Sequence, residues 1–171
     1  ETDQVRELLD AGELELDGWR KINEPDEEGR TALYLAAEGG HHATVRLLLS
    51  RGADTARGRV SDDHVHNGET PLIIAARGGH VAAVQALVEG GAAVDLPKIG
   101  GDGTAFYVAC QEGYASVARV LLEHGADVDL ATAKGVTPLG IACHRGFEPV
   151  VRLLLDWKAA INLAKDDGVT P

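Results

Sequence analysis

One eleven-residue pattern recurs four times along this chain, and it constrains the fold more than any other feature of the sequence. The copies read TALYLAAEGGH, TPLIIAARGGH, TAFYVACQEGY and TPLGIACHRGF, and they begin at Thr31, Thr70, Thr104 and Thr137. A fifth copy starts at Thr170, and successive threonines lie 39, 34, 33 and 33 residues apart. Self-similarity at a fixed period indicates a repeat architecture, in which each supersecondary unit stacks on the next.

Each copy of the pattern predicts a short helix. The threonine hydroxyl is a good N-cap acceptor for a free N–H of the first turn. Pro71 and Pro138 follow a threonine at the first helical position, where a missing N–H costs nothing. The leucine or phenylalanine and the small residues after it form one apolar stripe at helical spacing. We expect a glycine to end this helix in each copy, at Gly40, Gly79, Gly113 and Gly146.

A second helix is predicted after each of these glycines. The stretches VRLLLSRGAD, VQALVEGGAA, ARVLLEHGAD and VRLLLDWKAA place Val and Leu at helical spacing, and VRELLDAG near the N-terminus matches this part alone. Glycines are expected to end these helices, at Gly12, Gly52, Gly91 and Gly125. Helices this short are unstable alone, so each pair must bury its stripes against neighbouring pairs in a one-dimensional solenoid.

These motifs resemble the ankyrin repeat. GVTPL at residues 135–139 and GADVD at residues 125–129 are good local examples, and the match recurs four times in phase over almost the whole chain. The resemblance implies an all-α repeat fold, an ankyrin-type solenoid of helix–turn–helix units with projecting hairpin loops. It also implies protein–protein recognition through the hairpin tips and the concave helix face, without catalysis.

We expect residues 1–171 to form a single ankyrin repeat domain. Its parts are a partial first repeat with an insertion (1–25), three repeats (26–56, 57–96 with an extended hairpin, and 97–130), a fourth repeat (131–163) and the start of a truncated repeat (164–171). Because the chain begins with Glu1 and both ends fall within a repeat, we expect a fragment or a processed form.

Three segments are longer than the family pattern. Glu13–Lys21 is an insertion that carries Trp19. Arg57–Glu69 is six residues longer than the usual turn, and Leu96–Gly103 is one residue longer and rich in glycine.

Two kinds of substitution also depart from the pattern. Lys158 replaces the glycine that normally closes the second helix, which costs roughly 1 kcal/mol in a left-handed cap unless the helix ends differently. The position of the family's hydrogen-bonding histidine reads Tyr34, Ile73, Tyr107 and Gly140. This argues against an inter-turn histidine network. If Tyr34, Tyr107 and Trp19 are exposed, they are the expected anchors for a partner, since aromatic residues dominate binding hot spots.

By analogy with the family, partner contacts are expected on the hairpins and at the end of each first helix. The candidate residues are Glu27, Glu28, Arg30, Tyr34, Glu38, His66, Asn67, Glu69, Arg77, Asp102, Tyr107, Gln111, Glu112, Lys134, His144 and Arg145. This surface is acidic at the first repeat and mixed or basic at Arg77 and Arg145, which orients a partner more than it tightens binding. For each residue, exposure to solvent without any contact is the alternative.

Composition and charge narrow the class of partner. The chain is 44% hydrophobic and 25% charged, values typical of a globular protein, and its net charge is −11. This acidity disfavours nucleic acid and anionic membranes, and no apolar run approaches the ~18 residues that a membrane span needs. We expect a protein partner, and the low cysteine count favours an intracellular, cytoplasmic location.

The strongest chemical cluster lies in the extended hairpin. Asp62, Asp63, His64 and His66 carry the kinds of side chain that bind zinc. A structural zinc site usually needs four fixed ligands, however, so a polar hairpin tip is the preferred interpretation.

Other apparent sites are interpreted as structural. His41 and His80 are expected to cap helix turns. Cys110 and Cys143 occupy equivalent positions, where repeats packed ~8–10 Å apart exceed the ~7 Å limit for a disulfide. Both are therefore expected to be small core residues. Residues 98–104 lack the G-K-[ST] of a phosphate loop. We expect no catalytic residue, no metal and no cofactor.

A protein-binding module is the leading functional hypothesis, and a structural spacer or assembly element of a larger repeat protein is the alternative. The helices expected over residues 138–156 lack the polar outer face of a terminal repeat. We therefore expect more repeats, another domain or a second copy of the chain to cover them, and the last of these means self-association through this end. A metal-dependent role of residues 62–66 is a further alternative. Another is asparaginyl hydroxylation at Asn23 or Asn162, which the family resemblance suggests.

Overall fold

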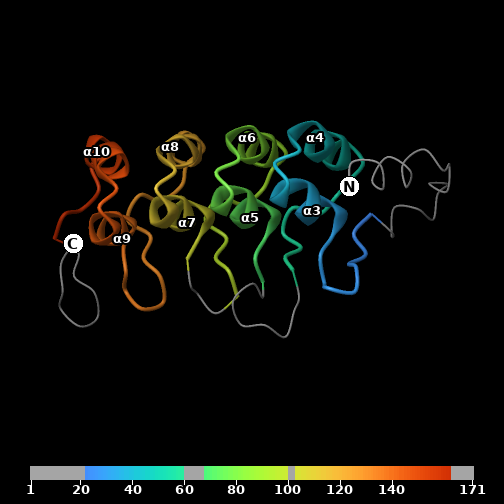
Figure 1. The fold of residues 1–171 in the computed structure, drawn as a ribbon, viewed down its shortest axis with the longest axis horizontal. Coiled ribbons are helices and arrows are strands. Elements are labelled where there is room, and N and C mark those ends of the chain that lie inside the picture. Colours follow the sequence, from blue (N-terminus) through green and yellow to red (C-terminus); the bar gives the residue numbers. More distant parts are fainter. Residues whose placement is uncertain (1–21, 60–67, 100–102, 163–171) are drawn as a thin grey trace.

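Four stacked helix pairs make up the part of the chain that the computed structural model describes, residues 22–59, 68–99 and 103–162. The first helices of the pairs are α3 (Ala32–Glu38), α5 (Pro71–Arg77), α7 (Ala105–Glu112) and α9 (Pro138–Arg145). The second helices are α4 (His42–Ser50), α6 (Val81–Glu89), α8 (Ala115–Glu123) and α10 (Glu148–Asp156). They form two parallel rows, and the connecting loops project beyond the row of first helices (Figure 1). The expected all-α solenoid of helix–turn–helix units is confirmed.

Threonine caps start all four first helices, as the sequence predicts. The hydroxyls of Thr31 and Thr104 each accept a hydrogen bond at 3.2 Å from the backbone N–H three residues on. Thr70 and Thr137 do the same at 3.3 and 3.0 Å. All four threonines are buried, so the caps satisfy N–H groups that water could not reach.

Each second helix is followed by a residue in the left-handed conformation. Gly52, Gly91 and Gly125 have φ of 85°, 89° and 88°, and Lys158 has φ of 62° at the equivalent position. The α10 helix therefore ends as its counterparts do, with lysine in a conformation that favours glycine by roughly 1 kcal/mol.

The core is a continuous layer of small aliphatic side chains between neighbouring pairs. Consecutive first helices contact one another, as do consecutive second helices. Alanine, valine, leucine and isoleucine dominate the buried cluster, and Phe106 is its one phenylalanine among the described residues. Since no single pair can bury both of its stripes alone, stability arises from the stack.

Aromatic and imidazole rings join neighbouring repeats at the end of the first helices. The His80 ring lies over Gly40, the Tyr114 ring over Gly79 and the Phe147 ring over Gly113 of the preceding repeat. A methyl group on Gly113 would meet the Phe147 ring at 2.8 Å. Glycine is needed here both for its positive φ and for this close approach.

Side-chain acceptors tie the turns of successive repeats together. Asn23 Oδ1 accepts a hydrogen bond from Asp54 N at 2.8 Å, and Asp129 Oδ1 accepts one from Ala160 N at 2.9 Å. Asp95 accepts from Asp127 N in the same way, at 3.2 Å. These bonds satisfy loop backbone groups and fix the register of each repeat on the next.

Two expectations about core and cap residues are wrong in part. Cys110 is fully buried, but Cys143 is exposed at the equivalent position of α9, where no described repeat covers it. His41 and His80 stand before α4 and α6, yet neither side chain caps its own helix. The His80 Nε2 atom instead contacts the Glu38 carbonyl oxygen of the preceding repeat at 3.0 Å.

Candidate partner-binding surface

The sixteen candidate contact residues fall into four groups in the structure. The exposed ones are Glu27, Glu28, Glu38, Glu112, Lys134, His144 and Arg145. The half-buried ones are Arg30, Arg77 and Gln111. The buried ones are Tyr34, Glu69 and Tyr107. His66, Asn67 and Asp102 lie outside the described residues. Contact with a partner stays a prediction for all of the exposed and half-buried residues.

The two tyrosines cannot act as exposed anchors. Tyr34 is 1% exposed on α3 and Tyr107 is 6% exposed on α7. Both rings pack inside the stack, because the family's histidine position faces the neighbouring repeat rather than solvent. The suggestion that they face a partner is wrong.

Glu69 is also misplaced by sequence reasoning, because its side chain is completely buried. It precedes α5, and its Oε1 atom accepts a hydrogen bond from Nη2 of Arg77, the last residue of the same helix. The pair thus reaches along the whole of α5, a helix of seven residues and about 10 Å. Arg77 keeps 30% of its side chain exposed, but its charge is already compensated inside the protein. The main role of Arg77 is therefore to stabilise the fold.

The Tyr34 hydroxyl lies in the same polar region between α3 and α5. Burial, together with the negative charges of Glu69 and Glu38, raises the pKa of Tyr34 to about 12, while the charge of Arg59 and its side-chain hydrogen bonding to the hydroxyl oppose this shift. Within the described part of the chain, neither Tyr34 Oη nor Arg77 Nε makes a hydrogen bond of good geometry, although Arg59 lies close to the Tyr34 hydroxyl. A buried donor without a partner destabilises the folded state, so this region carries a free-energy cost.

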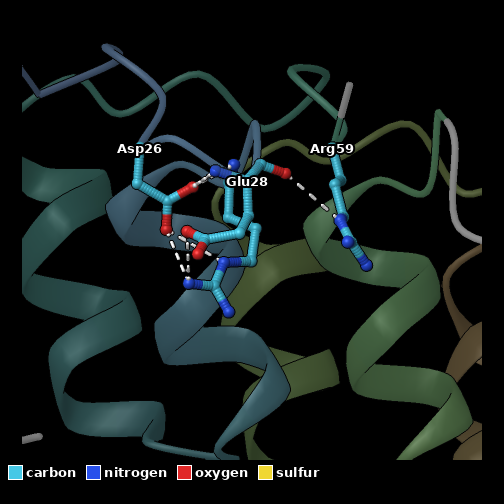
Figure 2. A network of polar contacts seen from close by, with 4 residues as sticks. Asp26, Glu28 and Arg59 are labelled. Carbon is cyan, nitrogen blue, oxygen red and sulfur yellow. Dashed lines mark hydrogen bonds and ion pairs between the residues drawn. The ribbon is translucent and has the colours of Figure 1, made fainter. Parts of the chain in front are cut away.

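A second polar network organises the first hairpin (Figure 2). Asp26 Oδ1 accepts hydrogen bonds from the backbone N–H groups of Glu28 and Arg30, at 3.1 and 2.8 Å. The Arg30 guanidinium binds both carboxylates, at 2.8 Å to Asp26 and 3.0 Å to Glu28. Arg59 Nε donates to the Glu28 carbonyl oxygen at 3.3 Å and so joins this hairpin to the next.

The charges of this network are coupled. Burial alone would raise the pKa of Asp26, but the hydrogen bonds and charge of Arg30 and the Glu28 backbone lower it below its usual value. The Asp26 hydrogen bond in turn raises the pKa of Arg30. Glu28 and Arg30 therefore shape the hairpin, and both remain accessible in part to a partner.

Sequence reasoning missed two residues of this surface. Asp26 is the acceptor that folds the first hairpin, and its signal is an aspartate three residues before a glycine, a pattern typical of tight turns. Ile99 is 65% exposed on the third hairpin and packs over Gly68 of the hairpin before it. An apolar residue in a glycine-rich turn is a weaker signal.

The proposed metal ligands Asp62, Asp63, His64 and His66 lie outside the described residues. Among the residues that are described, no group of three or more His, Cys, Asp or Glu side chains could hold a metal ion. None of the described helices is long and apolar enough to cross a membrane.

The fold and its surface define a class of protein, a helical repeat solenoid whose exposed face is assembled from equivalent positions of successive repeats. The family model described as ankyrin repeats (3 copies) matches residues 1–59 and 57–132, and the ankyrin repeat model matches residues 134–167. The chain therefore belongs to the ankyrin repeat family. No match was found among curated proteins. Ankyrin repeat proteins are generally non-enzymatic modules for protein–protein interaction.

Proposed function

We propose that this chain binds a protein partner through the exposed side chains on its hairpins and at the ends of its first helices. The observation that carries the proposal is that Glu38, Glu112 and Arg145 are exposed and lie at the ends of three first helices. The stack holds these helices in fixed register through its caps and inter-repeat hydrogen bonds. Charged side chains on rigid elements lose little backbone entropy on binding, which favours recognition.

Capture of partners by the immobilised chain, followed by mass spectrometry, tests this proposal. A protein that is retained reproducibly and displaced by free chain should bind less tightly when Glu38 and Arg145 are both reversed in charge. Arg119→Glu is the matched control, because Arg119 is exposed on α8, in the other row of helices. Loss of binding in the control alone, or in neither variant, would place the contact elsewhere.

A second candidate function is assembly through the face of α9 and α10. Leu155 is 49% exposed, Trp157 40% and Ile161 57%. Leu122 stands at the position equivalent to Leu155 and is buried, and Leu49, also equivalent, packs over Gly90 of the following repeat. This face therefore resembles surfaces that are covered elsewhere in the stack.

Sedimentation over a range of protein concentrations tests self-association through this face. Assembly predicts a mass that rises with concentration and returns to that of the monomer in Leu155→Gln. A monomer at all concentrations contradicts this second candidate.

A further inference from the structure

The charged side chains at the ends of the first helices follow an order along the stack that folding alone does not require. Two positions before each left-handed glycine are equivalent in the four repeats. The earlier position holds Glu38, Arg77, Gln111 and His144, and the later one holds Gly39, Gly78, Glu112 and Arg145. The two positions are adjacent at the end of each first helix, and the first helices form one row (Figure 1). Glu38 occupies the earlier position and Glu112 and Arg145 the later one, and together the two positions form a row of helix ends along α3, α5, α7 and α9.

Internal pairing decides which of these charges remain available. Arg77 is compensated by the buried Glu69 carboxylate, so the row is neutral at α5. Glu112 accepts a hydrogen bond at 3.1 Å from the Gln111 amide, which is uncharged and leaves the negative charge in place. The charged groups of Glu38 and Arg145 take part in no hydrogen bond or ion pair within the described part of the chain, and both are exposed.

The resulting order is negative at α3, neutral at α5, negative at α7 and positive at α9. We infer that the partner is a protein segment that lies along this row with cationic side chains over Glu38 and Glu112 and an anionic side chain over Arg145. This inference rests on the proposed function and specifies the chemistry of the partner. Complementary charges of this kind set orientation and association rate more than total affinity.

The spacing of the repeats also limits the length of the segment. Neighbouring helices pack roughly 8–10 Å apart, so Glu38 and Glu112 are separated by about 20 Å and Arg145 lies about 10 Å further on. An extended chain advances about 3.3 Å per residue. The two cations of an extended partner are then about six residues apart, and the anion follows after about three more.

Two synthetic peptides test this order. The matched peptide is a ten-residue chain of Ser and Thr with Lys at its first and seventh positions and Glu at its last, and the other has every charge reversed. Binding is followed by NMR on the isotope-labelled protein at low ionic strength, where surface charges are least screened. The matched peptide should bind at least tenfold more tightly, and a spin label beside its Glu should broaden the amides around Arg145 more than those around Glu38.

Variants decide whether the row itself is responsible. Glu38→Lys and Arg145→Glu should each weaken the matched peptide at least threefold, whereas Arg119→Glu on α8 should not. Equal binding of both peptides, no binding of the matched one, or broadening at the wrong end would overturn the inference. A natural partner that binds the wild type and these variants with equal affinity would contradict the inference but would still support the proposed function. Failure to capture any partner would count against the proposed function and against the inference that rests on it, whereas the peptide comparison tests the charge order separately.

Discussion

Glu69 and Arg77 form an ion pair along one face of α5, with the Glu69 carboxylate fully buried and the Arg77 guanidinium partly exposed. The pair joins the residue before the Thr70 cap to the last residue of the helix. Two positions that the family resemblance assigns to partner contact are therefore used for folding. In this chain the centre of the candidate binding row is electrically neutral, and its free charges lie on either side.

The first prediction concerns the stability of this pair. Arg77→Ala should lower the free energy of unfolding by about 2–3 kcal/mol, because a buried carboxylate loses its main charge compensation while the lost cation was itself part-exposed. Urea unfolding followed by circular dichroism measures the change. Arg145→Ala, which removes an exposed cation, should change stability by less than about 0.5 kcal/mol. Equal effects of the two substitutions would show that the Glu69 pair contributes nothing.

The second prediction concerns the buried Tyr34 hydroxyl. Tyr34→Phe should stabilise the protein by less than about 1 kcal/mol at neutral pH, because the buried hydroxyl makes no hydrogen bond of good geometry but lies beside Arg59. The sign at alkaline pH follows from the pKa, which is about 12 in the folded state and about 10 for an ordinary tyrosine. Between these values the unfolded chain loses the proton first, so the wild type loses stability as pH rises.

The advantage of Tyr34→Phe should therefore grow above pH 10, by up to about 1.4 kcal/mol per pH unit. Chemical denaturation of both proteins at neutral and alkaline pH measures this difference. The same pH slope in both proteins would mean that the Tyr34 hydroxyl is not held in its protonated form by the fold.

The third prediction concerns the end of α10. Lys158→Gly should raise stability by about 1 kcal/mol, because Lys158 has φ of 62° and glycine adopts this conformation without strain. For a chain of this size that gain corresponds to a melting temperature about 2–4 °C higher. Lys158→Ala is the control, since it removes the charge and keeps the strain. A similar rise for alanine would assign the effect to the lysine side chain.

The fourth prediction uses two equivalent glycines with different neighbours. Gly113 and Gly146 have φ of 83° and 75°, but only Gly113 has a ring over it. Gly113→Ala should therefore cost about 1 kcal/mol more than Gly146→Ala, the extra amount being the displacement of Phe147. Thermal unfolding of both variants separates the two effects. Identical losses would mean that backbone strain alone selects these glycines.

Much of the fold could be predicted from local sequence patterns. Each threonine cap can be predicted because the threonine hydroxyl that accepts and the backbone N–H that donates lie within one turn. The left-handed conformation of Lys158 at the end of α10 can be predicted in the same way, since Lys158 aligns with Gly125 of the preceding repeat. These features depend on residues that are close in sequence, and the repeat period places them in register.

The candidate site was harder to predict, because it depends on contacts between repeats. The burial of Tyr34 depends on the hairpin and helix of the next repeat, and the burial of Glu69 depends on how Arg77 folds back along α5. Cys143 differs from Cys110 only in what lies beside it in the stack. A single repeat pattern contains no information on such neighbours, so equivalent positions receive the same prediction and differ in the structure.

Binding along the first helices is tested most directly by the affinity of a captured partner for the wild-type chain and for the double variant Glu38→Lys/Arg145→Glu. Isothermal titration calorimetry measures this affinity, and thermal unfolding measures the stability of both proteins. We expect at least a tenfold loss of affinity with an unchanged melting temperature, because both side chains are exposed and unpaired in the described structure. An unchanged affinity would contradict the claim that the partner binds along the first helices.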